Sequence, residues 1–397
     1  MTRIMQKLRI ITTGFIGLLP AGGVTWDYLQ YPLGLAEMGH EVYYLEDTQL
    51  YPIYQAPGKA WDDASDSIAH LQKVMDHFGF RERWCYRDEA SGQHFGLSEK
   101  ELKDICSSAD IFINVSCSTV MREAYAQIPV RVLIDSDPMF TQIQLETGLS
   151  FTGKKSSMRD LVDKHTHHFT FGENLGSSEC KIPTAGINWM PTRQPICLDY
   201  WPVLPLPKEN LPTFTTLMNW SAGKTLQFGG QSWGQKDEEF EKIIRLPQKL
   251  NKAAFAIVVN QTGGATFPKE ELEAKGWTIQ DPNKVAGDWT DYQQFIQQSF
   301  AEFSVAKNTY VKSNSGWFSC RSACYLASGR PVITQDTAWS KYIPTGKGLF
   351  SFCNLEEAVE AVQQIMNRPQ EHSQAAREIA IAFFDSEKVL GAMLNQL

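Results

Sequence analysis

The sequence contains no apolar run long enough to cross a bilayer. A membrane-spanning helix needs ~20 predominantly apolar residues, and the longest candidate, residues 10–20, is interrupted by threonines and glycines. Arg3, Lys7 and Arg9 accompany this run, but no small-residue cleavage site follows it, so we interpret it as a first strand and turn and not as a signal peptide. We therefore expect no transmembrane segment.

Paired cysteines and a basic surplus are also lacking. The eight cysteines include no CxxC pair, which argues against a disulfide framework and favours a reducing, cytoplasmic location. The 45 acidic residues outnumber the 37 lysines and arginines, which gives a net charge of −8. Because nucleic-acid binders usually carry a basic surplus, we expect no nucleic-acid partner, although a local basic pocket could still hold one or two phosphates.

The chain has the composition of a globular protein with two domains, or three. Of its 397 residues, 43% are hydrophobic and 12% are aromatic. Strand and helix patterns alternate from the N-terminus, which predicts parallel sheets covered by helices on both faces. The expected elements are strands at Leu8–Thr12, Val42–Leu45, Ile111–Val115 and Val130–Ile134, and a helix over Val24–Met38 that Pro32 kinks and Gly39 ends.

A proline-rich stretch, residues 202–212, interrupts this alternation and predicts a linker between domains. The alternation then restarts. The expected strands are Phe214–Asn219, Phe255–Val259, Glu302–Ala306 and Pro331–Thr334, and the expected helices are Phe240–Leu250, Tyr292–Phe300, one starting near Trp317, Leu355–Met366 and Ala375–Leu397. In open parallel sheets ligands bind outside the carboxyl ends of the strands, so the loops that follow each strand are the candidate site.

Two of these loops carry glycines before a helix. Gly22 and Gly23 open the first helix, whose N-terminus attracts phosphate, although a tight turn without a ligand explains the glycines equally well. Asn219 ends a predicted strand, and the glycine-rich loop after it leads to Lys236. Lys236 can neutralise a phosphate, or it can be a solvated loop residue.

Residues 314–337 are the densest cluster of polar residues at predicted ligand-facing positions. Ser315, Gly316 and Ser319 offer backbone and hydroxyl donors around a helix start, and Arg321 offers a forked guanidinium for an oxyanion.

Three polar residues, Gln335, Asp336 and Thr337, follow the last strand of this cluster. A polar ligand at this end of the strand would be read by hydrogen bonds. The alternative is that Asp336 caps the helical turn that begins after it.

The same stretch and its flanks resemble a known family. The matching segments are SGWFSCRSACYLASGRPVI, GKGLFSF, NLEEAVEAVQQIM, AAREIAIAFFDSEKVL and, near the N-terminus, GGVTWDYLQYPLGLAEMGHEV. They look like the GT-B-fold glycosyltransferases of the family-four and family-one type, in the expected order over nearly the whole chain. The loop from Gln231 to Lys236 resembles the Arg-x4-Lys phosphate pair of these enzymes.

Five positions depart from the family pattern. The two glutamates of the family-four enzymes fall on Gly316 and Cys324, and the arginine of the phosphate pair is Gln231. The family-one histidine falls on Asn314. In this group we would also expect an acid just before Arg321, where the chain has a cysteine.

The resemblance implies an α/β protein with two Rossmann-like domains facing across a cleft. Residues 1–205 would form the acceptor-side domain, residues 206–375 the donor-binding domain, and residues 376–397 a helix that crosses back onto the first domain. The implied reaction moves a sugar from a nucleotide-sugar donor to an unknown small-molecule or glycan acceptor, with the nucleotide sugar as co-substrate and no cofactor. The alternative is a catalytically weak GT-B-like protein that binds a nucleotide or a glycan.

The resemblance also implies roles for individual residues. Gln335 and Asp336 would read sugar hydroxyls, which an amide and a carboxylate can grip. Lys236 and Arg321 would neutralise the leaving diphosphate without a metal ion, and an inverting reaction would need a general base. The base candidates are Asp27, Asp137 and His168, with Asp27 ranked first. The expected donor-binding residues are Gly22, Gly23, Asn219, Lys236, Ser315, Gly316, Ser319, Arg321, Gln335, Asp336 and Thr337.

Weaker signals favour other readings. Asp135 and Asp137 mimic the DxD metal motif of GT-A enzymes, but we favour a role in acceptor binding or loop structure. His165, His167 and His168 lie near Glu173 without further ligands at sensible spacing for a metal site. The eleven tryptophans could include sugar-stacking platforms such as Trp26, Trp233 or Trp317, but we expect most of them to lie in the core.

Overall fold

A computed structural model describes residues 7–53, 58–148, 157–221, 223, 225–260 and 266–397. The described chain forms two compact units. Unit 1 comprises Met1–Gly172, Pro183–Cys197 and Ser386–Leu397, and unit 2 comprises Glu173–Ile182 and Leu198–Asp385. None of the helices in the described ranges is both long and apolar enough to cross a membrane.

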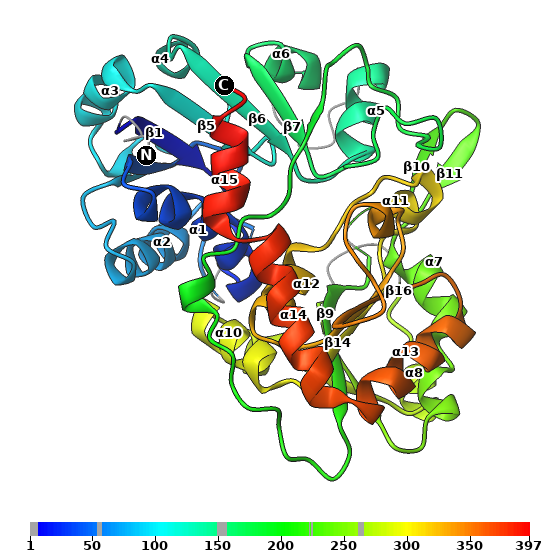
Figure 1. Ribbon diagram of the computed structural model, residues 1–397. Helices are drawn as coiled ribbons and strands as arrows, with labels where there is room; N and C mark the ends of the chain where they lie inside the picture. Colours follow the sequence, from blue (N-terminus) through cyan, green and yellow to red (C-terminus); the bar gives the residue numbers. More distant parts are fainter. Residues whose placement is uncertain (1–6, 54–57, 149–156, 222, 224, 261–265) are drawn as a thin grey trace, which may run out of the picture. The chain divides into compact units, whose positions relative to one another are not determined.

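Unit 1 is built on a sheet with the strand order β4-β3-β2-β1-β5-β6-β7-β8. Figure 1 labels its strands β1, β5, β6 and β7. All neighbours pair in parallel except β4, which forms an antiparallel pair with β3. The strands are β1 Arg9–Thr13, β2 Glu41–Glu46, β3 Trp84–Arg87, β4 His94–Gly96, β5 Ile111–Val115, β6 Val130–Asp135, β7 His167–Thr170 and β8 Met190–Pro191. The apolar runs that predicted strands therefore lie in the centre of this sheet, where both faces are buried.

The helices of unit 1 are α1 Gly22–Glu37, α2 Ser65–His77, α3 Glu99–Ser108, α4 Glu123–Ala126, α5 Phe140–Thr147, α6 Met158–Val162 and α15 Ser386–Leu394. Helix α1 continues through Pro32 and stops before Gly39, whose φ of 91° lies in the left-handed region. Helix α15 packs on α1, as the predicted return of the C-terminal helix requires. Gly34 permits this packing, because a Cβ there would lie 2.7 Å from a methyl carbon of Leu390.

Unit 2 has a parallel sheet with the order β13-β12-β9-β14-β15-β16. Aromatic residues fill its core, where Phe303 stacks on Phe352 with ring centroids 5.2 Å apart. The strands are β9 Thr213–Asn219, β12 Ala254–Asn260, β13 Trp277–Gln280, β14 Ala301–Ser304, β15 Val332–Gln335 and β16 Leu349–Phe352, with a separate hairpin of β10 Leu226–Phe228 and β11 Gln231–Trp233.

The helices of unit 2 are mostly short. They are α7 Lys236–Phe240, α8 Lys269–Ala274, α9 Pro282–Val285, α10 Trp289–Gln298, α11 Asn308–Ser313, α12 Cys320–Ala327, α13 Leu355–Asn367 and α14 Pro369–Phe383, with 3-10 turns η1 Leu198–Tyr200, η2 Glu241–Ile243, η3 Leu246–Lys249 and η4 Trp339–Lys341.

Three helix predictions need correction. The helix predicted over Phe240–Leu250 is a series of short turns, because Pro247 lacks the N–H that a continuous helix requires. The helix expected near Trp317 begins at Cys320. The predicted C-terminal helix is two helices, α14 and α15, separated where the backbone N–H of Ser386 donates to the carbonyl of Ile196, 2.9 Å away.

Candidate functional site

The connection between α11 and α12 brings several predicted site residues together at the carboxyl edge of the unit 2 sheet. We call residues Asn314–Ser319 the α11–α12 turn. The Ser315 side chain is buried; its hydroxyl donates to the carbonyl of Tyr310 and accepts from the N–H of Trp317, 3.3 and 3.2 Å away. The N–H of Gly316 donates to the carbonyl of Thr337 at 2.7 Å, and the Thr337 hydroxyl donates to the carbonyl of Trp317 at 2.7 Å. Ser315, Gly316 and Thr337 therefore form one bonded unit.

Gly316 has no room for a side chain. Its φ is 78°, and a Cβ at this position would lie 2.5 Å from the backbone nitrogen of Asn174. The glutamate of the family-four pattern would not fit here, which gives a physical reason for that departure.

Ser319, which is 7% exposed, is the N-cap residue directly before helix α12. The Ser319 side chain does not cap the helix. The first N–H groups of α12 therefore lack the hydrogen bond that a capping side chain at this position usually accepts.

Arg321 is directed into the interior of unit 2. Its side chain is 11% exposed, and Nε donates to Oε1 of Glu302 at 2.6 Å, while the other nitrogens donate to the carbonyl of Leu217 and the hydroxyl of Ser304. Burial lowers the pKa of Arg321, but the Glu302 carboxylate outweighs it, so the net pKa is raised. Because all three nitrogens have protein acceptors, these contacts favour a structural role over the predicted contact with a phosphate.

Gln335 is similarly occupied. Its amide nitrogen donates to the fully buried carboxylate of Glu239, and its amide oxygen accepts from the N–H of Ala306 at 3.2 Å. Glu239 also accepts from Nδ2 of Asn308 at 2.7 Å and from Nζ of Lys242 at 2.6 Å. This network fixes the ends of β14 and β15 and leaves no Gln335 amide group without a protein partner.

Asp336 accepts hydrogen bonds from the turn that leads into η4. Oδ1 accepts from the N–H of Ala338 at 2.8 Å, and Oδ2 accepts from the Ser340 hydroxyl at 2.7 Å. The side chain is half-buried. The residue at the N-cap position of η4 is Ala338, which makes no side-chain cap, so Asp336 holds the turn from two residues before that position. A role for Asp336 in reading a sugar stays a prediction.

Lys236 and Asn219 lie at the carboxyl edge of the same sheet. Asn219 is the exposed last residue of β9, and Lys236 is the half-buried first residue of α7. The start of α7 is fastened to the start of α11, because the N–H groups of Asn308 and Thr309 donate to the carbonyls of Gln235 and Gly234, both at 3.1 Å. The structure thus places Lys236 beside the loop that leads into α11.

The tryptophans suggested as sugar platforms differ in exposure. Trp26 and Trp233 are buried, and the ammonium group of Lys312 lies 4.9 Å from the ring centroid of Trp233. Trp317 is half-buried and stacks on Tyr310 with the ring centroids 4.5 Å apart.

In unit 1, the loop between β1 and α1 is held by a carboxylate that the sequence analysis missed. Glu46 is fully buried at the end of β2 and accepts from the N–H groups of Gly17 and Leu18, at 2.9 and 2.5 Å, and from the hydroxyl of Tyr44 at 3.1 Å. Burial raises the pKa of Glu46 to about 7. Gly22 is buried and Gly23 is half-buried where α1 begins, directly after this loop.

The three base candidates come from different elements of unit 1. Asp27 is half-buried in α1, and Asp137 is exposed after β6. His168 lies in β7, where Nε2 is 2.9 Å from the carbonyl of Val162, and burial lowers its pKa. No described contact joins these three side chains.

The DxD and histidine signals resolve into structural contacts. Asp135 is fully buried and accepts from Thr141, Gln142 and Thr170, at 2.7, 2.8 and 2.9 Å. His165 is buried, which lowers its pKa to about 3, and its Nδ1 lies 2.8 Å from the carbonyl of Leu161. Within the described ranges, no three His, Cys, Asp or Glu side chains gather closely enough to hold a metal ion.

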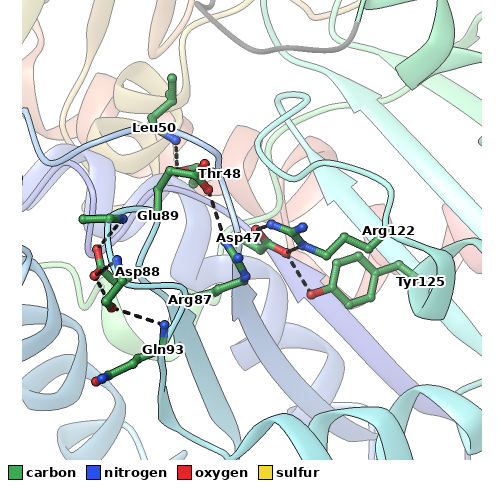
Figure 2. A network of polar contacts seen from close by, with 11 residues as sticks. Asp47, Thr48, Leu50, Arg87, Asp88, Glu89, Gln93, Arg122 and Tyr125 are labelled. Carbon is green, nitrogen blue, oxygen red and sulfur yellow. Dashed lines mark hydrogen bonds and ion pairs between the residues drawn. The ribbon is translucent and has the colours of Figure 1, made fainter.

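Unit 1 also contains a cavity of about 580 Å³ beside α3 and α4, a volume typical of small-molecule sites. Arg122, on its wall, forms a two-pronged pair with the buried Asp47, at 2.5 and 2.8 Å, and Tyr125 donates to the same carboxylate at 3.0 Å (Figure 2). Arg87, also on the wall, pairs with Glu89 at 3.1 Å. Because each of these arginines has a carboxylate partner, the two pairs add little net positive charge to the cavity wall.

Comparison with known proteins gives matches by structure alone. No family model matches the chain, and no curated protein matches it significantly. A glycosyltransferase from Rickettsia africae is 13% identical over 98% of this chain and 97% of its own, with a TM-score of 0.53. An α-glucosyltransferase solved with UDP and a 13-mer DNA is 11% identical over 98% and 99%, with a TM-score of 0.61. Anabaena HepE, solved with UDP and glucose, is 12% identical over 98% and 100%, with a TM-score of 0.56.

The chain has the GT-B fold. The matches cover both units and nearly all of each related chain, so the likeness extends beyond a single Rossmann-like sheet. This confirms the predicted fold class, with a Rossmann-like sheet in each unit and a C-terminal helix that returns to α1. At these identities the GT-B likeness shows the fold and leaves the donor and the acceptor undetermined.

Proposed function

We propose that this GT-B protein is a glycosyltransferase that moves a sugar from a nucleotide-sugar donor to an acceptor hydroxyl. The observation that carries the proposal is the fold likeness, over 98% of the chain, to a glycosyltransferase and to an α-glucosyltransferase that was solved with UDP. HepE, which has a similar fold, was also solved with UDP. We assign donor binding to the second domain, residues 206–375, and acceptor binding to the first, residues 1–205, with residues 376–397 as the returning segment.

The donor assignment is supported by the carboxyl edge of the unit 2 sheet. The uncapped start of α12 offers a partial positive charge for a diphosphate. Lys236 supplies a full charge at the start of α7, and Ser319, Gly316 and Ser315 supply backbone and hydroxyl groups. Arg321 is directed into the interior of unit 2. Lys236, which is half-buried beside the loop that leads into α11, is therefore the principal cation in this proposal.

The reaction needs a general base if it inverts the sugar configuration. Asp27 remains our first choice, because Asp137 is exposed and one ring nitrogen of His168 bonds to a backbone carbonyl. Charge on the departing diphosphate would be neutralised by Lys236 and the α12 N-terminus, so we propose that turnover needs no metal ion.

A thermal-shift screen with UDP-, GDP- and dTDP-sugars tests the proposal. A bound donor raises the melting temperature by mass action, so at least one nucleotide series should do so. Lys236→Ala should weaken that nucleotide about tenfold to a hundredfold, the range expected for a lost charge-assisted contact. Lys347→Ala is the matched control, because Lys347 is 59% exposed, pairs with the exposed Glu371 and precedes β16, at the opposite edge of the sheet.

The alternative, a GT-B-like binder without catalysis, has a separate signature. A nucleotide would raise the melting temperature, but no sugar would be transferred or released from any donor in the panel. Asp336→Asn adds a test of donor reading, because it keeps most of the capping ability and removes the charge. Unchanged kinetics across the panel would leave Asp336 with a capping role alone.

A further inference from the structure

A short segment of the chain departs from unit 1 and packs into unit 2. Residues Glu173–Ile182 lie between β7 and β8 in chain order, and both strands belong to the unit 1 sheet. The segment itself is part of unit 2. No motif in the sequence marks it, and the proposed reaction has so far given it no role.

Backbone and side-chain hydrogen bonds fasten this segment to the α11–α12 turn and the residue before it. The N–H of Asn174 donates to the carbonyl of Ser315 at 3.1 Å, and the N–H of Lys181 donates to the carbonyl of Ser313 at 2.9 Å. In the opposite direction, Nδ2 of Asn314 donates to the carbonyl of Glu179 at 3.3 Å. The contacts therefore extend along most of the segment.

Asn174 lies at the centre of these contacts and is 2% exposed. Its Nδ2 donates to the carbonyl of Asn314 at 2.8 Å, and its Oδ1 accepts from the hydroxyl of Tyr342, also at 2.8 Å. Together with its backbone N–H, Asn174 thus binds two consecutive carbonyls of the turn, those of Asn314 and Ser315.

These bonds fix the orientation of two peptide groups. A trans peptide directs its N–H opposite to its carbonyl, so holding one side sets the other. On the opposite sides, the N–H of Ser315 donates to the carbonyl of Tyr310, and the N–H of Gly316 donates to the carbonyl of Thr337. The turn needs this support because Asn314 and Gly316 have φ values of 52° and 78°.

We propose that Asn174 is a positioning residue that sets the conformation of the α11–α12 turn and, through it, the affinity for the donor nucleotide. The second half of the inference, the effect on donor affinity, rests on the proposed function, because it takes the turn as part of the donor site. The first half, the effect on the conformation of the turn, does not depend on that function. Asn174 acts through the turn and is not assigned a contact with the substrate.

Hydrogen–deuterium exchange of the full chain tests the first half without any ligand. Asn174→Ala removes both side-chain bonds, and exchange at residues 313–317 should become at least about tenfold faster, because opening of the turn sets the rate. Tyr342→Phe removes one of the two bonds and should give a smaller increase. Asn174→Asp keeps the size and the acceptor for Tyr342 but loses the bond to Asn314, so it should give a smaller increase than Asn174→Ala, and it serves if that variant fails to fold.

Asn354→Ala is the matched control, because Asn354 caps α13 by accepting from the N–H of Glu357 at 2.9 Å. It should speed exchange at the start of α13 and leave residues 313–317 unchanged. Wild-type exchange at residues 313–317 in both Asn174 variants overturns the positioning role. The same increase in Asn354→Ala also overturns it, because the effect would then reflect a general loss of stability in unit 2.

Calorimetry with UDP tests the second half. Asn174→Ala should raise the dissociation constant about tenfold, and Asn354→Ala should change it less than twofold. Because coupling is reciprocal, UDP should also slow exchange at residues 174–181 in the wild-type chain. A faster-exchanging turn with unchanged UDP affinity overturns the link to the donor. If the wild-type chain binds no UDP, GDP or dTDP, the proposed function and this link fail together, and the exchange result still decides the positioning role.

Discussion

Replacing Arg321 should destabilise unit 2 strongly, and this loss of stability should be larger than any direct effect on phosphate binding. Arg321→Ala leaves the Glu302 carboxylate fully buried without its charge partner, and Oε2 of Glu302 already has no described hydrogen-bond partner. Removing one member of a buried pair costs about 3–5 kcal/mol. Arg321 is 11% exposed, so little of this cost should be screened by solvent.

For a unit of this size, such a loss lowers the melting temperature by roughly 6–20 °C. Urea unfolding followed by tryptophan fluorescence, and thermal unfolding followed by calorimetry, should both show this loss of stability in the unit 2 transition. The double variant Glu302→Leu/Arg321→Met should recover much of the stability, because apolar residues of similar volume can replace a buried pair with little cost. A wild-type midpoint for Arg321→Ala, together with a large loss of nucleotide affinity, would refute this reasoning and restore Arg321 as a phosphate ligand.

Three further predictions concern unit 1 and the reaction. Burial raises the pKa of Glu46 to about 7 from an unfolded value of 4.5, so the folded state binds more protons between these two pH values. The free energy of unfolding should therefore fall by about 3 kcal/mol as pH rises through that window. Glu46→Gln should flatten this pH dependence, and an unchanged slope would contradict the prediction. Arg122→Ala should cost about 1–3 kcal/mol, because it strips the buried Asp47 of its ion pair but is itself 36% exposed, whereas Arg81→Ala, whose side chain is 78% exposed, should stay within about 0.5 kcal/mol. Turnover should persist in EDTA, and a loss that manganese restores would favour a metal-dependent reaction.

The sequence predicted the sheets because their central strands are continuous apolar runs. Ile111–Val115 is buried at every position, so its pattern needs no knowledge of the rest of the chain. The structure of the segment after Lys236 was harder to predict, because its apolar residues have the spacing of a helix while Pro247 divides the segment into separate turns. The break between α14 and α15 depends on a hydrogen bond from Ser386 to Ile196, a contact between distant parts of the sequence.

The candidate site was only partly predictable, because several of its contacts also join distant parts of the sequence. Residue types at strand ends identified the α11–α12 turn, since glycine, serine and a helix start occur there together. They did not show that Arg321 pairs with Glu302 from a neighbouring strand, or that Glu46 binds the loop before α1. Asn174 carries no local signal at all, because its role arises from contacts with residues more than a hundred positions away.

The central claim is that the chain transfers sugar from a nucleotide donor held by unit 2. The direct measurement is the release of nucleoside diphosphate from the UDP-, GDP- and dTDP-sugar panel, followed by mass spectrometry with wild-type protein and Lys236→Ala. We predict release from at least one donor, with a rate that falls about tenfold or more in Lys236→Ala while Lys347→Ala stays near wild type. Equal rates in all three proteins, or no release from any donor that raises the melting temperature, would contradict the proposed function.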